Sequence, residues 1–317
     1  NIQDRLNKKG SNVPFAMYDA FTDVPYSGSQ AAVILHASDI STPNRIRIAR
    51  EIGVPATAFV NDVNDNRIKV QFFSTVMDLP MCGHGTVCLI TRLVSQELLP
   101  CKGAGWHKAV LELPKGEAAV EYRRTKFGRV EVILDVKVAQ FVAAKLDLEE
   151  LLGILGVGVG EISNNLPPEV ATSNFIHLCL PMRDLTAIRD LKPDFTALTK
   201  FCNDNGLETI ATFSTEVVDK TCDVHVRDFC PAVGVTESAA AGTTNAALST
   251  YLFYKGVVKP SDDGNLQVCA EQGMELGRPS RVKTRMKTQS GNITRLQVGG
   301  LASLIVEGTI NVNLETL

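Results

Sequence analysis

The sequence predicts an α+β protein built from two barrel-like β domains, each wrapped around one central helix. Short segments rich in Val, Ile and Phe, bounded by Gly, Asn, Asp or Pro, recur along most of the 317 residues, which is typical of strands. Two longer segments, one in each half, resemble each other. Each contains a helix that is apolar on nearly all faces, which indicates burial inside its own domain.

The expected elements follow the chain in order. The first half has predicted strands at 14–21, 31–36, 57–62, 67–74, 108–116, 118–124 and 129–138. The segment 42–53 is a helix signature, because Thr42 can cap the helix, Pro43 suits its first turn and Gly53 lies just past its end. The second half begins with a helix over 146–157 and continues with predicted strands at 174–182, 208–214, 222–229, 266–273, 280–287, 293–300 and 303–312.

The internal repeat sets the domain organisation. The first half contains "IKVQFFSTVMDLPMCGHGTVCLITRLVSQE" and the second "CDVHVRDFCPAVGVTESAAAGTTNAALSTYLFYKG". Each reads as a strand with a Phe near its end, a connection, a Gly-Thr turn and an apolar helix. We therefore expect domains at 1–138 and 139–317, and leave open that the last strands pack back on the first domain. A cleft between two such domains is the natural place for a site.

Composition excludes several classes of protein. A hydrophobic fraction of 44% and a charged fraction of 21% are ordinary for a soluble globular chain, and the net charge of −3 gives no footprint for nucleic acid or an anionic membrane. No apolar run reaches the length of a membrane span, and the first residues show no signal-peptide core. A cytoplasmic location is expected.

Cysteine and histidine spacing gives no support for a metal or cofactor. The eight cysteines are scattered without a CxxC pair, so reduced and mostly buried thiols are expected. The histidines show neither HxH nor HxxxH spacing, and no glycine-rich nucleotide loop is present. We therefore predict neither a metal ion nor a cofactor.

The starts of the two apolar helices carry the candidate chemistry. A helix start offers unpaired N–H groups and partial positive charge, and Gly83, Gly85, Gly242 and Thr243 would let an anion approach closely. The same field would lower the pKa of a thiol there. Cys82 and His84, side by side in "MCGHGT", are then candidate proton carriers at a carbon acid.

Other interpretations of these residues stay open. Cys82 could equally be a small buried hydrophobe, and Cys88 reads as core. His225 lies in an alternating strand, where a capped or surface position is the default. Asp19 and Asp78 stay under consideration, because Asp is rare in buried strands unless it is paired.

The chain resembles the PhzF-like (phenazine biosynthesis-like) family, which shares the diaminopimelate epimerase and proline racemase fold. The matching stretches, in order, are "DAFTDVPYSGSQAAVIL", "RIAREIGVPATAFV", "FFSTVMDLPMCGHGT", "VRDFCPAVGVTESAAAGTTNAALSTYL", "EQGMELGRPSRV" and "VGGLASLIVEGTI". The resemblance implies the double-barrel fold, cofactor-independent proton transfer at carbon, and homodimers.

The catalytic pattern of the family is incomplete here. Its "LSETTFV" segment reads "VPATAFV", which puts Ala56 in the place of the catalytic Glu. Ser29 replaces the Asn of "GNPAAV", and Ser238 replaces the Asp of "EDPATGSA". A hydroxyl survives as Thr243 and the first-half imidazole as His84.

Compared with a two-thiol racemase, Cys82 matches the first thiol but Ala241 stands at the second. Replacing a general acid or base by Ala removes a rate factor of roughly 10²–10⁴.

We therefore expect an isomerase with an atypical base that acts on a small carboxylate or carbonyl metabolite. The resemblance further implies a role in specialised biosynthesis. Proton transfer would have moved to Cys82, His84, Asp78 or Glu237. The expected substrate contacts are Ser29, Ala56, Gly83, Gly85, Thr86, Ser238, Ala241, Gly242, Thr243 and Thr244. Two alternatives remain: a cyclase or dehydratase that orients a reactive intermediate in the same cleft, and a binding protein without catalysis.

Overall fold

The computed structural model describes residues 12–312, and the fold within them is α+β, as predicted. The first half carries the following elements: β1 (Asn12–Ala20), β2 (Ser29–Ile34), α2 (Thr42–Ile52), β3 (Ala56–Asn64), β4 (Arg67–Phe73), β5 (Asp78–Leu79), α3 (Gly83–Ser95), β6 (His107–Leu113), β7 (Gly116–Arg124) and β8 (Val130–Asp135).

The second half is larger because it contains additional short helices. Its elements are β9 (Gln140–Ala143), α4 (Leu148–Ile154), β10 (Glu169–Thr172), β11 (Ile176–Pro181), α5 (Leu185–Arg189), α6 (Phe195–Asn205), β12 (Thr209–Ser214), β13 (Val224–Cys230), β14 (Val235–Ser238), α7 (Gly242–Tyr254), β15 (Asn265–Gln272), β16 (Ser280–Gln289), β17 (Asn292–Gly300) and β18 (Ala302–Asn311). Three 3-10 helices lie at Val159–Glu161, Pro231–Val233 and Met274–Leu276.

The strand pairings repeat between the halves, which confirms the predicted pseudo-symmetry. In the first half β2 pairs parallel with β3, β3 antiparallel with β4, and β4 antiparallel with β5 and parallel with β6. In the second half β11, β12, β13, β14 and β15 repeat this order and these directions. The central helix follows the short strand each time, as α3 after β5 and α7 after β14.

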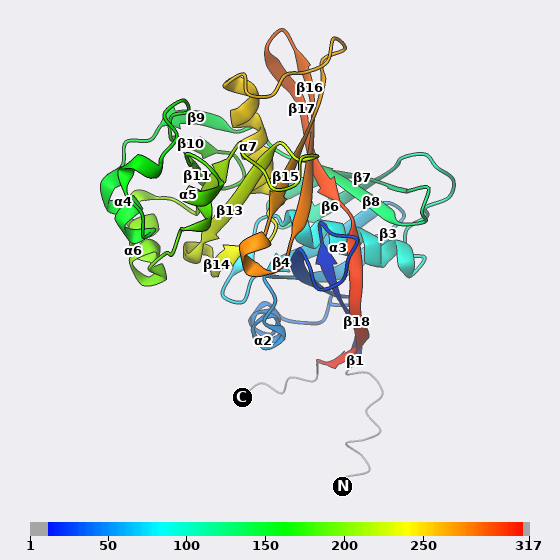
Figure 1. Ribbon diagram of the computed structural model, residues 1–317. Helices are drawn as coiled ribbons and strands as arrows, with labels where there is room; N and C mark the ends of the chain where they lie inside the picture. The colour runs from blue at the N-terminus through cyan, green and yellow to red at the C-terminus, as the bar shows by residue number, and fades with distance from the viewer. Residues whose placement is uncertain (1–11, 313–317) are drawn as a thin grey trace.

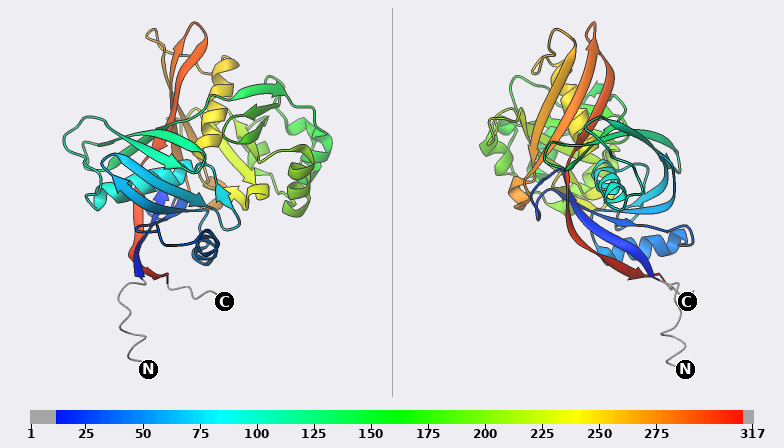
Figure 2. Two further views of the ribbon diagram at one scale, coloured as in Figure 1. Left: turned by 180° about the vertical axis from the view of Figure 1, so that it is seen from behind. Right: turned by 90° about the vertical axis from the view of Figure 1, so that its right-hand side faces the viewer.

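Each central helix lies against the strands of its wall. Helix α3 packs on β1, β2, β3 and β8, and α7 on β11, β12, β16 and β17. Figure 2 shows α3 nearly end-on with strands curving around it. Ten of the thirteen residues in each helix are buried, which explains why neither sequence shows a polar face.

Strands near the end of the chain join the two halves. Strand β18 pairs antiparallel with β1, and β17 pairs antiparallel with β8. Figure 1 shows β18 beside β1 at the bottom of the molecule, far from the lobe that holds β9–β14. The boundary at residue 138 stays a prediction, and residues 1–11 and 313–317 of the two predicted domains lie outside the described residues.

Helices α5 and α6 were not expected from the sequence, although α6 carries clear signals. Asp194 caps α6 by accepting from the N–H groups of Thr196 and Ala197, and Gly206 ends it in the left-handed conformation. Within residues 12–312, no helix has both the length and the apolar character that crossing a membrane requires.

Of the capped or surface position expected for His225, the surface position is wrong. Its ring is fully buried between two carboxylates, with Nδ1 2.6 Å from Glu271 and Nε2 2.7 Å from Glu275. Burial acts to lower the pKa of His225, but the hydrogen bonds to Glu275 and Glu271 outweigh it and leave that pKa raised.

This arrangement predicts a pH-dependent contribution to stability. Because the folded pKa lies above the unfolded value, the contribution is fully present below the unfolded pKa and is lost as the pH rises through the folded pKa. Urea unfolding of the wild type and of His225→Gln across pH 5–9 tests this contribution, because the two proteins differ in no other side chain. The stability difference should shrink as the pH rises, and a difference that grows would contradict this prediction.

Candidate active site

The two central helices meet at their amino ends. A Cβ placed on Gly83 would lie 3.3 Å from the Cα of Gly242, and one placed on Gly242 would lie 3.5 Å from the Cα of Gly83. A side chain at Gly83 would therefore press on the facing backbone, and one at Gly242 would lie in direct contact with it. Glycine at both positions permits this close approach, and it brings two helix starts with their partial positive charge to one place.

A cavity of about 100 Å³ lies at this meeting point, and we call it the helix-start pocket. Engineered cavities of about 150 Å³ hold benzene, so a short-chain acid fits this smaller space, while a six-membered ring would require it to widen. Its lining comes from both halves and consists of Pro55, Ser74, Leu79, Met81, Cys82, Gly83, His84, Phe175, Thr209, Asp228, Cys230, Val233, Val235, Ser238, Ala241, Gly242, Thr243 and Thr244.

Cys82 and His84 line the pocket next to each other. The Cys82 Sγ lies 3.3 Å from the His84 Nδ1, and it also accepts a hydrogen bond from the Gly85 N–H at 3.3 Å. The thiol thus caps α3. Helix α7 has Ala241 at the same position and no side-chain cap, so its first N–H groups are the better place for a substrate anion.

The expected lowering of the thiol pKa is wrong. Burial raises the pKa of Cys82 to about 12, outweighing the hydrogen bonds from the backbone of Gly85 and His84. Burial also lowers the pKa of His84 to about 4, against the hydrogen bond to the Gln30 backbone. At neutral pH the site therefore presents a neutral thiol beside a neutral imidazole, and neither changes its charge there.

Asp228, on β13, is the titratable group that the sequence analysis missed. It is fully buried and lines the pocket, and its Oδ2 accepts a hydrogen bond from the Thr244 hydroxyl at 2.9 Å. Its Oδ1 is buried without a hydrogen-bond partner among the described residues. Burial raises the pKa of Asp228 to about 7, more than the hydrogen bonds from Thr244 and Thr209 lower it.

The buried imidazole of His177 supports Asp228 through two threonine hydroxyl groups. The His177 Nδ1 lies 2.7 Å from the Thr209 hydroxyl and 3.4 Å from the Thr244 hydroxyl. Burial lowers the pKa of His177 to about 4, so this ring is neutral as well. The two threonines therefore connect a neutral imidazole to the carboxyl group and hold the rotamer of Asp228.

The structure brings together many of the predicted site residues. Cys82, Gly83, His84, Ser238, Ala241, Gly242, Thr243 and Thr244 all line the pocket. Gly85 and Thr86 lie in the first turn of α3, where the Thr86 hydroxyl donates to the Cys82 carbonyl oxygen at 2.7 Å. They support the helix start from inside the core.

Besides Gly85 and Thr86, four predicted residues lie outside the lining. Ser29 and Ala56 are buried at the first positions of β2 and β3, and Asp78 is exposed on β5. Glu237 holds Arg227 through two hydrogen bonds of 2.9 Å. Asp19, also under consideration, accepts from the Tyr26 N–H at 2.6 Å and from Arg278 at 2.8 Å. The carboxylates of Glu237 and Asp19 therefore hold neighbouring segments in place.

No cluster of three metal-ligating side chains occurs within the described part of the chain. The pocket itself is lined by neutral hydrogen-bonding groups, uncapped helix N–H groups and a single carboxyl group that titrates near neutrality.

A doubled barrel with its central helices meeting end to end is a fold shared with racemases and epimerases. A hydroxyproline epimerase from Agrobacterium vitis has the same fold, with a TM-score of 0.62, 11% identity, and coverage of 96% of this chain and 94% of that one. The phenazine biosynthesis protein of the PhzF family from Bacillus anthracis is more similar, with a TM-score of 0.83, 23% identity, and coverage of 94% and 99%. The predicted fold class is confirmed.

The family follows from the sequence match. A family model described as "Phenazine biosynthesis-like protein" matches residues 18–308, so the chain belongs to the PhzC-PhzF family. The trans-2,3-dihydro-3-hydroxyanthranilate isomerase of Pseudomonas chlororaphis is 28% identical, over 93% of this chain and 98% of its own length. The resemblance stated from the sequence is confirmed, and so is the prediction of an enzyme of the isomerase class.

Proposed function

We propose that this protein is a cofactor-independent isomerase that moves a proton between carbon atoms of a small, unsaturated carboxylate or carbonyl compound, with Asp228 as the proton carrier. The observation that supports this most strongly is the buried Asp228 carboxyl group, with one oxygen unpartnered among the described residues, in the same pocket as His84 and the start of α7. A pKa of about 7 is well matched to an acid that must also act as a base near neutral pH.

The proposed reaction needs one base. The Asp228 carboxylate takes a proton from a carbon next to the substrate's carboxylate or carbonyl group, and the C–H electron pair enters the conjugated system. The resulting Asp228 carboxylic acid exchanges its proton with solvent and gives a proton to another carbon, so a double bond shifts and no atom or electron is lost. The neutral His84 imidazole and the uncapped N–H groups of α7 stabilise the negative charge on the substrate oxygen.

The pocket supports isomerisation over the two alternatives. A cyclase would be favoured by a large apolar cavity, whereas this one measures about 100 Å³ and carries His84, Cys82 and Asp228. A binding protein without catalysis would be favoured by a filled cleft. The relative that isomerises trans-2,3-dihydro-3-hydroxyanthranilate supports an unsaturated cyclic carboxylate as the substrate class. The homodimer, the cytoplasmic location and the role in specialised biosynthesis stay predictions of the same proposal.

Deuterium exchange tests the reaction. The protein is incubated in D₂O with trans-2,3-dihydro-3-hydroxyanthranilate and with a panel of small unsaturated carboxylates, and NMR follows the C–H signals. We expect a substrate whose isomerised product carries deuterium at carbon. Product formed without any deuterium, at less than one turnover as well as at many, would indicate that the proton does not pass through a group that exchanges with solvent.

A further inference from the structure

A second cavity, of about 680 Å³, lies on the side of β16 that faces the first half of the molecule. We call it the basic pocket and define it by Phe21, Arg123, Glu131, Arg281, Lys283 and Arg285, which lie in its wall. Its volume falls within the roughly 300–1,000 Å³ typical of small-molecule sites. Walls from both halves form it, since Phe21 and Arg123 come from the first and β16 from the second.

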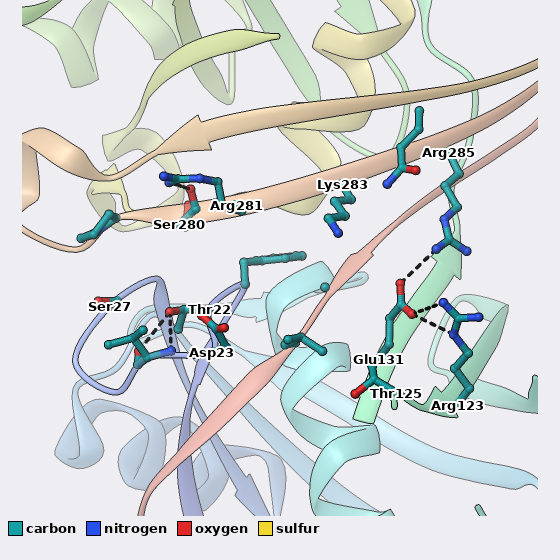
Figure 3. Close-up of a pocket in the computed structure, with 16 residues that line it drawn as sticks. Thr22, Asp23, Ser27, Arg123, Thr125, Glu131, Ser280, Arg281, Lys283 and Arg285 are labelled. Atoms are coloured by element: carbon teal, nitrogen blue, oxygen red, sulfur yellow. Dashed lines mark hydrogen bonds and ion pairs between the residues drawn. The ribbon is translucent and has the colours of Figure 1, made fainter. Parts of the chain in front are cut away.

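The charge of the basic pocket is positive. Its lining holds four cationic side chains, Arg123, Arg281, Lys283 and Arg285, against two acidic ones, Asp23 and Glu131. Arg281 is paired with Asp219 at 2.9 Å, outside the pocket. Lys283 has no carboxylate or hydrogen-bond partner among residues 12–312, and Figure 3 shows its ammonium group directed from β16 into the open space. A cation with this position is available to a ligand.

The other end of the pocket is already ordered. Glu131 accepts from Arg285 at 3.0 Å and lies 2.8 Å from a nitrogen of Arg123, as Figure 3 shows. Both guanidinium groups lie over the Trp106 ring, with distances of 4.4 and 5.2 Å to its centroid. Two arginines share one carboxylate, so one positive charge remains at this end. Trp106 and Glu131 already hold the two arginine side chains in fixed rotamers. A ligand that pairs with the remaining charge therefore loses little side-chain entropy.

The Phe21 ring separates this cavity from the helix-start pocket. It lines the basic pocket, and its Cζ lies 3.4 Å from a Cβ placed on Gly242 at the start of α7. The Phe21 backbone is left-handed, with φ of 62°, and is fixed by hydrogen bonds to Leu301 at 2.7 Å and Arg281 at 3.1 Å. Val24, Pro279 and Leu301 add apolar wall on the same side.

We infer that the basic pocket binds a small organic anion that carries two negative charges and an apolar body. One charge would pair with Lys283 and the other with the Arg123–Arg285 end, while the body packs on Phe21 and Leu301. An organic phosphate and a dicarboxylate share this chemistry. The inference does not depend on the proposed isomerase reaction, because none of these residues lines the helix-start pocket.

Isothermal titration calorimetry with three probes tests the inference. Phenyl phosphate and phthalate both offer two charges on a ring, and benzoate offers one. We expect saturable binding of one phenyl phosphate or one phthalate per chain, with benzoate weaker by about tenfold, roughly the value of one charge-assisted contact. Binding of phenyl phosphate alone would assign the site to phosphates, and binding of phthalate alone to dicarboxylates.

Matched variants locate the binding. Lys283→Ala should weaken the dianion about tenfold and Lys283→Glu should abolish saturable binding, while Lys69→Ala, at an exposed strand lysine outside the pocket, should change nothing. Circular dichroism confirms that each variant is folded. The inference would be overturned if no dianion bound to saturation, if benzoate bound as tightly as phthalate, or if Lys283→Glu bound as well as the wild type.

Discussion

Asp228→Asn should lower the rate of proton exchange at carbon by roughly 10²–10⁴, the usual contribution of a general acid or base. Asn keeps the size of the side chain and can still accept the hydrogen bond from the Thr244 hydroxyl, so the pocket should keep its shape. Activity of the wild type should rise with pH to an inflection near 7, because the base must be ionised. The inflection should be absent from the residual rate of the variant.

The same substitution should stabilise the fold at high pH. The folded pKa of Asp228, about 7, lies above the unfolded value, so ionisation in the folded protein lowers stability as the pH rises through 7. Urea unfolding at pH 8 should find Asp228→Asn more stable by roughly 2–4 kcal/mol, with little difference below pH 4.

Asp62→Asn, at an exposed position on β3, serves as the control for both measurements. Full activity in Asp228→Asn would remove the proton carrier from the proposal, whatever its stability.

Glu237→Gln should unfold far more easily than the wild type and yet retain its kcat. The Arg227–Glu237 pair is buried, with exposed side-chain fractions of 9% and 6%. Arg227 also donates to the carbonyl oxygens of Ile188 and Leu191, which fixes the end of α5. Loss of the carboxylate leaves a buried guanidinium without its counter-charge, which costs about 3–5 kcal/mol.

Urea unfolding measures that loss, and turnover is measured at a temperature where the variant is still folded. Glu117→Gln provides the comparison, because Glu117 pairs with Arg67 at the surface, where screening makes an ion pair weak. A fall in kcat without a loss of stability would instead make Glu237 a catalytic residue, as the sequence analysis allowed.

The sequence predicted the fold because the fold repeats itself. The two similar segments ending in apolar helices share one order of parallel and antiparallel pairings, and this forces both helices into equivalent positions. The close approach of Gly83 and Gly242 follows from the same symmetry. Helix α6 was missed although Asp194 and Gly206 mark both its ends, because the surrounding strands dominated the pattern.

The chemistry of the site was harder to predict, because it depends on burial. A thiol at a helix start suggests a low pKa, but the surrounding core reverses the direction for Cys82. Asp228 escaped notice although a signal existed. Asp228 lies on the same face of β13 as Val224 and Val226, because side chains two residues apart in a strand point the same way. A carboxylate on an otherwise apolar face is expected to be buried, as Asp228 is. His177 lies in the apolar strand β11, and it was missed because its role also depends on burial.

The most direct test of a proton carrier at the helix starts is the titration of Asp228 itself. Protein labelled with ¹³C at the aspartate carboxyl carbon is titrated by NMR, and Asp228→Asn assigns the signal. We expect an inflection near pH 7 that moves when a small carboxylate such as crotonate saturates the pocket. An Asp228 signal that titrates near the ordinary value of about 4, and does not respond to crotonate, would contradict proton transfer by this residue.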